Sequence, residues 1–184
     1  NALAGNLKFY KSMLKPGVKI MVMVKAFSYG SGSFEIANVL QYHKIDYLAV
    51  AYADEGIALR RGGITMPIMV MSPEPSAFEA IVKYKLEPEL YNLDILKGFL
   101  NFLPEHEHGY PVHLKIDTGM HRLGFDETDV DDLLQTLKHA YGIKVKSVFS
   151  HLVGSEEARH DDFTRYQINL FKKITERISQ ELDY

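Results

Sequence analysis

The sequence contains no cysteine, no long hydrophobic run and no marked surplus of charge of either sign. The absence of cysteine excludes disulfides, thiol nucleophiles and zinc–thiolate sites. The 21 Lys and Arg residues against 24 Asp and Glu give a formal net charge of −3, so the basic surplus typical of nucleic-acid-binding proteins is missing. No apolar run approaches the roughly 18 residues of a membrane span. We therefore expect no nucleic-acid partner and no membrane segment.

What is present is ordinary globular composition, 46% hydrophobic and 24% charged over 184 residues. A chain of this length can bury a sizeable core without a metal or a disulfide. It begins with Asn1 rather than Met, and apolar residues follow helical spacing from Ala2 to Leu14. We therefore expect a piece of a longer, cytoplasmic protein.

Strand-like and helix-like segments alternate along the whole chain. We expect the helices to begin with caps at Ser33, at Ser76 with Glu79, and at Thr128 with Asp131. Repeated βα units predict an α/β fold with a parallel sheet and right-handed crossovers. The strand-like segments are residues 18–24, 47–52, 67–72, 87–92, 112–117 and 144–150, and the first is expected to be buried on both faces.

Two architectures fit six βα units. One is a complete doubly wound sheet, and the other is a (β/α)8 TIM-type barrel truncated to about six units, since a whole barrel has eight. Polar residues follow several of the strands, among them Lys25, Asp54 and His151. Barrel sites draw on many strand ends, whereas a doubly wound site concentrates at one switch point. The spread of polar residues favours the truncated barrel.

The first candidate site is Lys25, which ends an apolar strand and precedes a loop with Gly30 and Gly32. Burial favours a neutral lysine amine, the form that attacks an aldehyde. The glycines allow a ligand to approach closely, and the helix start behind them favours an anion such as phosphate. The alternative is an ordinary turn with a solvent-directed lysine. The segment is neither G-x-G-x-x-G, because Glu35 replaces the third glycine, nor a Walker-type loop.

The second candidate site surrounds the end of the fifth strand, where Lys115, Asp117 and Arg122 lie close in sequence. The planar charge of Arg122 can bind a carboxylate or a phenolate oxygen. The alternative is a surface arginine beside an aspartate that satisfies turn amides. His151 follows the sixth strand, either as a ligand-binding or as a structural histidine. The histidines of loop 106–108 predict no metal site.

Segments 24–32 and 115–124 resemble the alanine racemase family of pyridoxal-phosphate enzymes. The resemblance implies an N-terminal (β/α)8 barrel that binds pyridoxal 5'-phosphate, and in the family a C-terminal β domain follows it. Residues 1–184 would then form one incomplete barrel domain. The similarity also includes segments 54–64, 67–71, 149–151 and 162–171, in the same order as in the family.

The resemblance also implies roles for five residues. Lys25 would be catalytic, forming the Schiff base with the cofactor and acting as the base on one face of the substrate α-carbon. Tyr29 would contact the phosphate, and His151 would lie near the cofactor ring. Arg122 would contact the phenolic oxygen of the cofactor and lie beside the substrate. Lys115, often carbamylated in the family, would position Arg122.

The chain also departs from the family pattern. Phe27, Ser28 and Ser31 replace the residues usual in the first motif. The second catalytic base, in the family a tyrosine from the C-terminal domain of the partner subunit, has no counterpart. We therefore expect that this chain alone does not racemise alanine at a useful rate. The strand edges left by a truncated barrel predict a homodimer.

The function predicted is interconversion of L-alanine and D-alanine, which supplies D-alanine for peptidoglycan and the cell wall. One alternative is a pyridoxal-phosphate-binding regulatory protein or an amino-acid decarboxylase of the same fold. Another is a scaffold domain of a larger cell-wall ligase fusion. A third is a phosphate-sugar barrel enzyme in which Lys25 remains unmodified.

Overall fold

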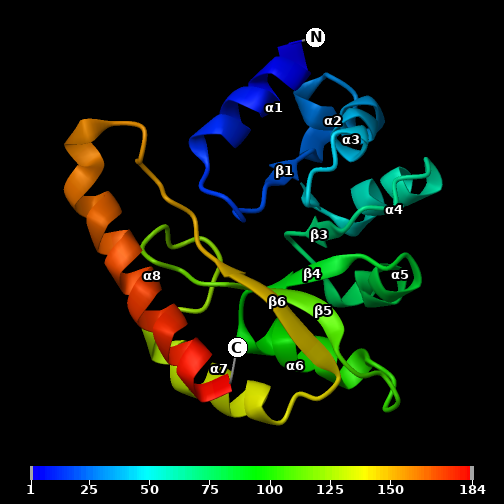
Figure 1. Cartoon of the computed structure of the whole chain (residues 1–184). Helices are drawn as coiled ribbons and strands as arrows, with labels where there is room; N and C mark the ends of the chain where they lie inside the picture. The colour runs from blue at the N-terminus through cyan, green and yellow to red at the C-terminus, as the bar shows by residue number, and fades with distance from the viewer. Residues whose placement is uncertain (1, 183–184) are drawn as a thin grey trace. The chain divides into compact units, whose positions relative to one another are not determined.

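A computed structural model describes residues 2–182, which divide into two compact units. Among the described residues, unit 1 comprises 2–71 and 82–86, and unit 2 comprises 72–81 and 87–182. Each unit contains three parallel strands with helices between them (Figure 1). The predicted α/β class with parallel strands is thus confirmed. Within residues 2–182, no helix is long and apolar enough to cross a membrane.

The core of unit 1 forms around its second and third strands. Leu48 pairs with Ile68, and Val50 pairs with Val70. All four side chains are fully buried, as expected for strands that read as continuous apolar runs. In chain order, the elements are α1 (Ala2–Met13), β1 (Met21–Met23), α2 (Lys25–Tyr29), α3 (Ser33–Tyr42), β2 (Tyr47–Val50), α4 (Ala53–Arg61) and β3 (Ile68–Val70).

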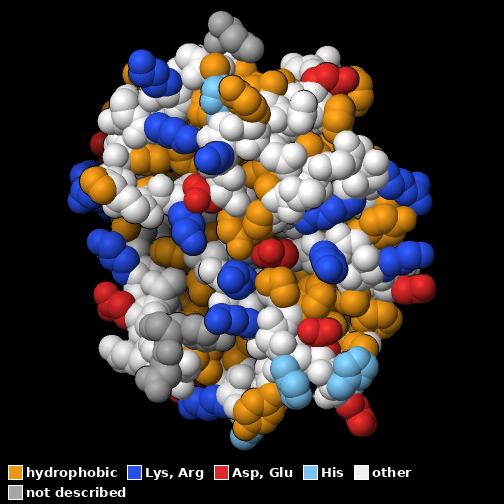
Figure 2. Space-filling view, turned by 45° about the vertical axis from the view of Figure 1, so that its right-hand side comes forward, with side chains coloured by type: hydrophobic (Ala, Val, Ile, Leu, Met, Phe, Trp, Pro, Cys, Tyr) orange, Lys and Arg blue, Asp and Glu red, His pale blue; other side chains and the backbone are white. Residues whose placement is uncertain are grey.

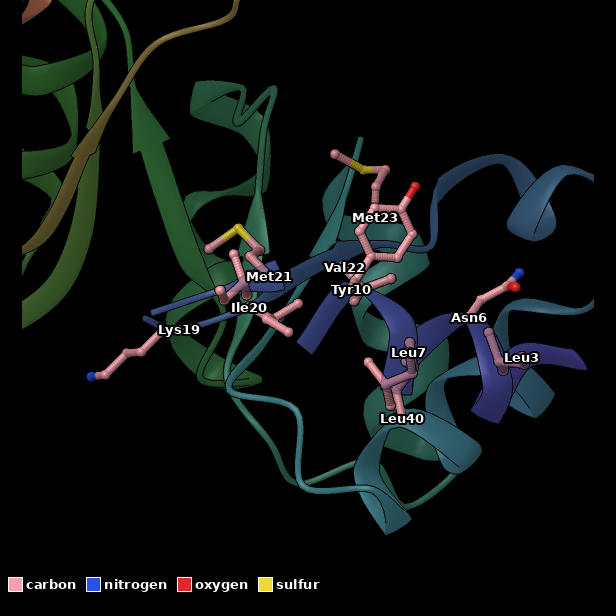
Figure 3. A pocket seen from close by; sticks show the side chains of 11 residues that line it. Leu3, Asn6, Leu7, Tyr10, Lys19, Ile20, Met21, Val22, Met23 and Leu40 are labelled. Atoms are coloured by element: carbon pink, nitrogen blue, oxygen red, sulfur yellow. The ribbon is translucent and has the colours of Figure 1, made fainter. Parts of the chain in front are cut away.

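Strand β1 is shorter and more exposed than expected. It contains three residues rather than seven, and Met21 is exposed. The expectation of burial on both faces is therefore wrong for β1, and only the adjoining Val24 is fully buried. β1 flanks an apolar groove of about 550 Å³ together with α1. Figure 3 shows Leu7 of α1 near Leu40 of α3 in this groove, with Lys19 pointing away.

Unit 2 is also built on three parallel strands. Leu114 pairs with Leu90 on one side and with Val148 on the other. Helix α7 lies beside α8 (Figure 1), where Lys138 pairs with Glu181 at 2.7 Å. In chain order, the elements are the 3₁₀ turn η1 (Pro75–Ala77), α5 (Phe78–Lys83), β4 (Glu87–Leu90), α6 (Leu93–Phe102), β5 (Tyr110–Lys115), η2 (Glu127–Asp129), α7 (Val130–Lys138), β6 (Ile143–Phe149), η3 (Ala158–His160) and α8 (Asp161–Leu182). The last two residues of α5 belong to unit 1.

The predicted helix caps are wrong in detail. Ser33 is the first residue of α3 rather than its cap, and its hydroxyl donates to the Val24 carbonyl at 2.8 Å. Ser76 lies inside η1, because the proline before it starts a 3₁₀ turn one residue earlier. The carboxylate of Asp126 accepts a hydrogen bond from the Thr128 amide at 2.7 Å and caps η2, so Thr128 lies inside this turn and Asp129 is the N-cap residue of α7.

The surface agrees with the balanced charge of the sequence. Figure 2 shows Lys and Arg side chains interspersed with Asp and Glu on the visible face.

Candidate active site

Lys25 directly follows the buried Val24, whose amide continues the strand by donating to the Ala49 carbonyl at 2.8 Å. The four residues after Lys25 form a left-handed turn, Ala26–Tyr29, with φ angles between 48° and 54°. Left-handed backbone costs an L-residue roughly 1–2 kcal/mol. Four such residues in succession therefore need support from elsewhere in the fold, and such strain is concentrated at functional sites.

The support comes from Glu55 in the first turn of α4. One carboxylate oxygen of Glu55 accepts the Ala26 amide at 2.7 Å. The other accepts the Ala51 amide at 2.7 Å and the Tyr52 amide at 3.2 Å. Glu55 therefore ties the left-handed turn to the end of β2. The sequence pattern assigned no role to Glu55.

The side chains around this turn are accessible to a ligand. Lys25 is half-buried, and the Tyr29 side chain is 74% exposed. Gly30 has φ 92°, and a Cβ at this position would meet no atom within 4 Å, so the space beside it is open. Unit 1 thus presents an amine and a phenol at the end of β1. The apolar groove between α1 and β1 is lined by neither of them.

In unit 2, Asp117 organises the loop that carries Arg122. One of its oxygens accepts the amides of Gly119, Met120 and His121 at 2.8, 3.0 and 3.1 Å. Asp117 therefore satisfies the turn amides, which is the alternative role predicted for it. Arg122 is exposed at the far side of this loop.

The same loop is closed at its base by backbone hydrogen bonds. Phe125 donates to the Lys115 carbonyl and accepts from the Asp117 amide, both at 2.9 Å. Gly124 allows this closure, because it has φ 132° and a Cβ there would lie 2.5 Å from the Asp117 nitrogen. The backbone that carries Arg122 is thus fixed at both ends.

Lys115 lies beneath this loop and is almost completely buried. Its ammonium lies 3.9 Å from Glu89 Oε1 and 5.1 Å from the centroid of the Phe149 ring. Burial raises the pKa of the Glu89 carboxyl to about 7, and the positive charges of Lys115 and Arg122 oppose that shift. The structure thus pairs Lys115 with Glu89, a residue that no sequence pattern singled out.

A second buried polar group crosses the three strands of unit 2. His113 contacts Glu87 at 2.9 Å through Nε2 and Ser147 at 2.7 Å through Nδ1. His113 is 1% exposed. A buried imidazole with a polar partner at each nitrogen is a well-satisfied structural group. Nothing in the sequence pattern distinguished this histidine from an exposed one.

His151 follows β6 in an exposed position, and its backbone carbonyl accepts a hydrogen bond from the side-chain amide of Gln167 at 3.0 Å. Gln167, on α8, is completely buried. It also donates to the Thr118 hydroxyl at 3.2 Å and accepts from the Val153 amide at 3.1 Å. Gln167 therefore fastens the loops after β5 and β6 to each other. Its place on an amphipathic helix gave no sign of this role.

The structure thus presents the predicted residues in two sets. Lys25 and Tyr29 lie in unit 1, and Lys115, Arg122 and His151 lie in unit 2. Within residues 2–182, no group of three or more His, Asp or Glu side chains could hold a metal ion.

Comparison with known proteins places the chain in a family. The family described as "Alanine racemase, N-terminal domain" matches residues 1–184. The chain is 34% identical over 182 residues to an alanine racemase of Clostridium novyi (strain NT), covering 97% of this chain and 46% of that protein. It is also 34% identical over 182 residues to a serine/alanine racemase of Enterococcus gallinarum, covering 97% of this chain and 25% of that protein.

A solved structure of alanine racemase from Clostridium difficile 630 superposes with a TM-score of 0.89 at 33% identity. The match covers 97% of this chain and 47% of that one. The likeness confirms the predicted truncated barrel-type α/β fold. The chain spans about half the length of several racemases that it matches. With residues 1–184 matched in sequence and 97% of the chain matched in fold, the chain belongs to the alanine racemase family, as its N-terminal domain.

Proposed function

We propose that this chain is the pyridoxal-phosphate-binding part of a racemase that interconverts L-alanine and D-alanine. The observation that carries the proposal is Lys25, a half-buried amine placed at the end of β1 by the left-handed turn Ala26–Tyr29. An amine that serves a covalent cofactor must be fixed in position yet open to an aldehyde. Membership of the family supplies the reaction to which this geometry is assigned.

The side chains present fit the proposed cofactor. Pyridoxal phosphate carries an aldehyde, a phosphate and a phenolic oxygen, which call for an amine, hydrogen-bond donors and a cation respectively. Lys25, Tyr29 and Arg122 supply these groups, and none of the three is buried. The open space beside Gly30 leaves room for an anion next to the exposed Tyr29 side chain.

Each residue then has a defined task. Lys25 would hold the cofactor covalently and move a proton at the α-carbon of the substrate. Tyr29 would bind the phosphate, and Arg122 would bind the phenolic oxygen and the substrate, with Lys115 positioning Arg122. His151 would lie near the cofactor ring. When bound, the cofactor supplies an electron sink that stabilises negative charge at the substrate α-carbon.

Further parts of the proposal concern the longer protein. The product D-alanine would serve peptidoglycan synthesis, and the enzyme would act in the cytoplasm as a homodimer. Racemisation needs a second base on the opposite face of the α-carbon, so the chain by itself would be inactive. Because the E. gallinarum relative is named a serine/alanine racemase, serine is a second candidate substrate. A full-length protein carrying these residues should be assayed with alanine, serine, lysine and ornithine.

The test of the cofactor site is reductive trapping. The chain is incubated with pyridoxal phosphate, reduced with borohydride, digested and analysed by mass spectrometry. We expect the reduced adduct on the Lys25 peptide, and we expect it to disappear in Lys25→Ala. Lys19→Ala is the matched control, because it removes an exposed lysine six residues away. Adducts spread over surface lysines, unchanged by Lys25→Ala, would refute the proposed cofactor site.

A further inference from the structure

Glu89 is an unusual buried acid. It lies in β4 with no measurable exposure, and among the described residues neither of its carboxylate oxygens has a hydrogen-bond partner. A buried carboxyl without hydrogen bonds is costly and rare in folded proteins. We therefore looked for a function of the Glu89 carboxyl in the charged groups around it.

The charges that act on Glu89 come from two segments. From β5, the ammonium of Lys115 lies 3.9 Å from its Oε1, which is an ion pair beyond hydrogen-bond length. From the loop after β5, the positive charge of Arg122 also lowers the pKa of Glu89. On β4 itself, Glu87 is hydrogen-bonded to His113 at 2.9 Å. Of the two glutamates of β4, Glu89 is therefore the one directed toward the cations of the candidate site.

Two neighbours of Lys115 interact favourably with a positive charge on its side chain. The ammonium lies 5.1 Å from the centroid of the Phe149 ring, within the range of a cation–π interaction. A carbamate would form if the neutral amine bonded to the carbon of carbon dioxide and released a proton. The resulting anion would face the carboxylate of Glu89 and the electron-rich face of Phe149, and both would repel it.

We propose that Glu89 is a positioning residue that supplies the buried negative charge beneath Arg122, and that Lys115 remains an unmodified ammonium paired with it. The charge holds the ammonium of Lys115 and attracts the guanidinium of Arg122, which restricts the orientations that Arg122 adopts. The assignment rests on the proposed function for what Arg122 binds. The pairing of Glu89 with Lys115 does not depend on it.

The charge state of Lys115 is tested without cofactor. The chain is incubated with ¹³C-labelled bicarbonate and examined by ¹³C NMR, beside Lys115→Arg, which keeps the cation and cannot form a carbamate. We expect no carbamate resonance that distinguishes the two proteins. A carbamate resonance in the wild-type chain that is lost in Lys115→Arg would overturn the proposal. Because no cofactor is involved, this result is independent of the reductive trapping at Lys25.

The positioning role is tested in a full-length protein that carries these residues. We expect Glu89→Gln to lower kcat roughly 10- to 100-fold with a smaller effect on KM, because a misplaced guanidinium weakens orientation more than binding. The pH dependence of the visible absorbance of the bound cofactor should shift as well, which a purely structural role would not cause. Glu89→Asp should recover part of the loss, and Lys115→Arg should retain most of the activity. Loss of activity in Lys115→Arg together with full activity in Glu89→Gln would refute the proposal.

Discussion

Replacing Glu89 with glutamine removes a buried acid whose ionisation opposes folding. Burial raises the pKa of Glu89 from 4.5 to about 7, so the folded chain binds this proton more tightly than the unfolded chain does. The stabilisation of the folded chain by this more tightly bound proton is fully present below pH 4.5 and is lost as the pH rises through about 7. A difference of about 2.5 pKa units corresponds to about 3 kcal/mol at 1.36 kcal/mol per unit. Relative to wild type, Glu89→Gln should therefore gain about 3 kcal/mol of stability between pH 4.5 and pH 8.

The measurement is the urea unfolding of wild type and Glu89→Gln at several pH values. The free energy of unfolding of one is subtracted from that of the other, because this removes the pH dependence of all groups that are not coupled to Glu89. Glu87→Gln is the matched control, since it neutralises the other glutamate of β4, which is already hydrogen-bonded to His113. Lys115→Met provides a second check. Lys115 lowers the pKa of Glu89, so in its absence the difference should grow. If the difference in free energy of unfolding between Glu89→Gln and wild type stays constant within about 0.5 kcal/mol from pH 4.5 to pH 8, the assignment of a desolvated carboxyl at Glu89 is refuted.

Two further predictions concern the loops that carry the candidate residues. Gly124→Ala should lower the free energy of unfolding by about 2–4 kcal/mol, because a Cβ would lie 2.5 Å from the Asp117 nitrogen and the backbone has positive φ. The control is Gly63→Ala, which should cost less, because Gly63 has positive φ but a Cβ there would have no neighbour within 4 Å. Equal losses for the two variants in urea unfolding would contradict the steric argument. Glu55→Gln should cost roughly 1.5–3 kcal/mol, because Glu55 accepts three backbone amides as a carboxylate. It should also slow trapping at Lys25, and a loss no larger than that of the exposed Glu79→Gln would show that Glu55 does not support the turn.

The order of the elements and the position of Lys25 could be predicted from the sequence. Apolar runs such as 47–52 and 67–72 mark buried strands by their composition, and these runs became β2 and β3. Lys25 stood out because it interrupts such a pattern at the point where a strand ends. Helix starts were predicted less well, because Ser33 and Thr128 suit either a cap or the first turn, and only the local backbone decides between these positions.

Other features depended on groups that meet only in the folded chain. Glu87 and Glu89 alternate with Pro88 and Leu90, a pattern that suggests a half-exposed strand rather than a buried one. The support of the left-handed turn by Glu55 joins residues 29 positions apart. No local pattern in the sequence contains such a contact.

The sequence by itself determined which residues could react and where along the chain each strand ends. It did so because hydrophobic periodicity and turn residues are local properties. The tertiary structure decided the environment of those residues. The register that sets Glu89 opposite His113, with Lys115 two residues further along β5, places an acid and an amine on one face of the sheet. Burial then changes the proton affinity of the acid, and burial is a property of the packed chain that the order of residues does not specify.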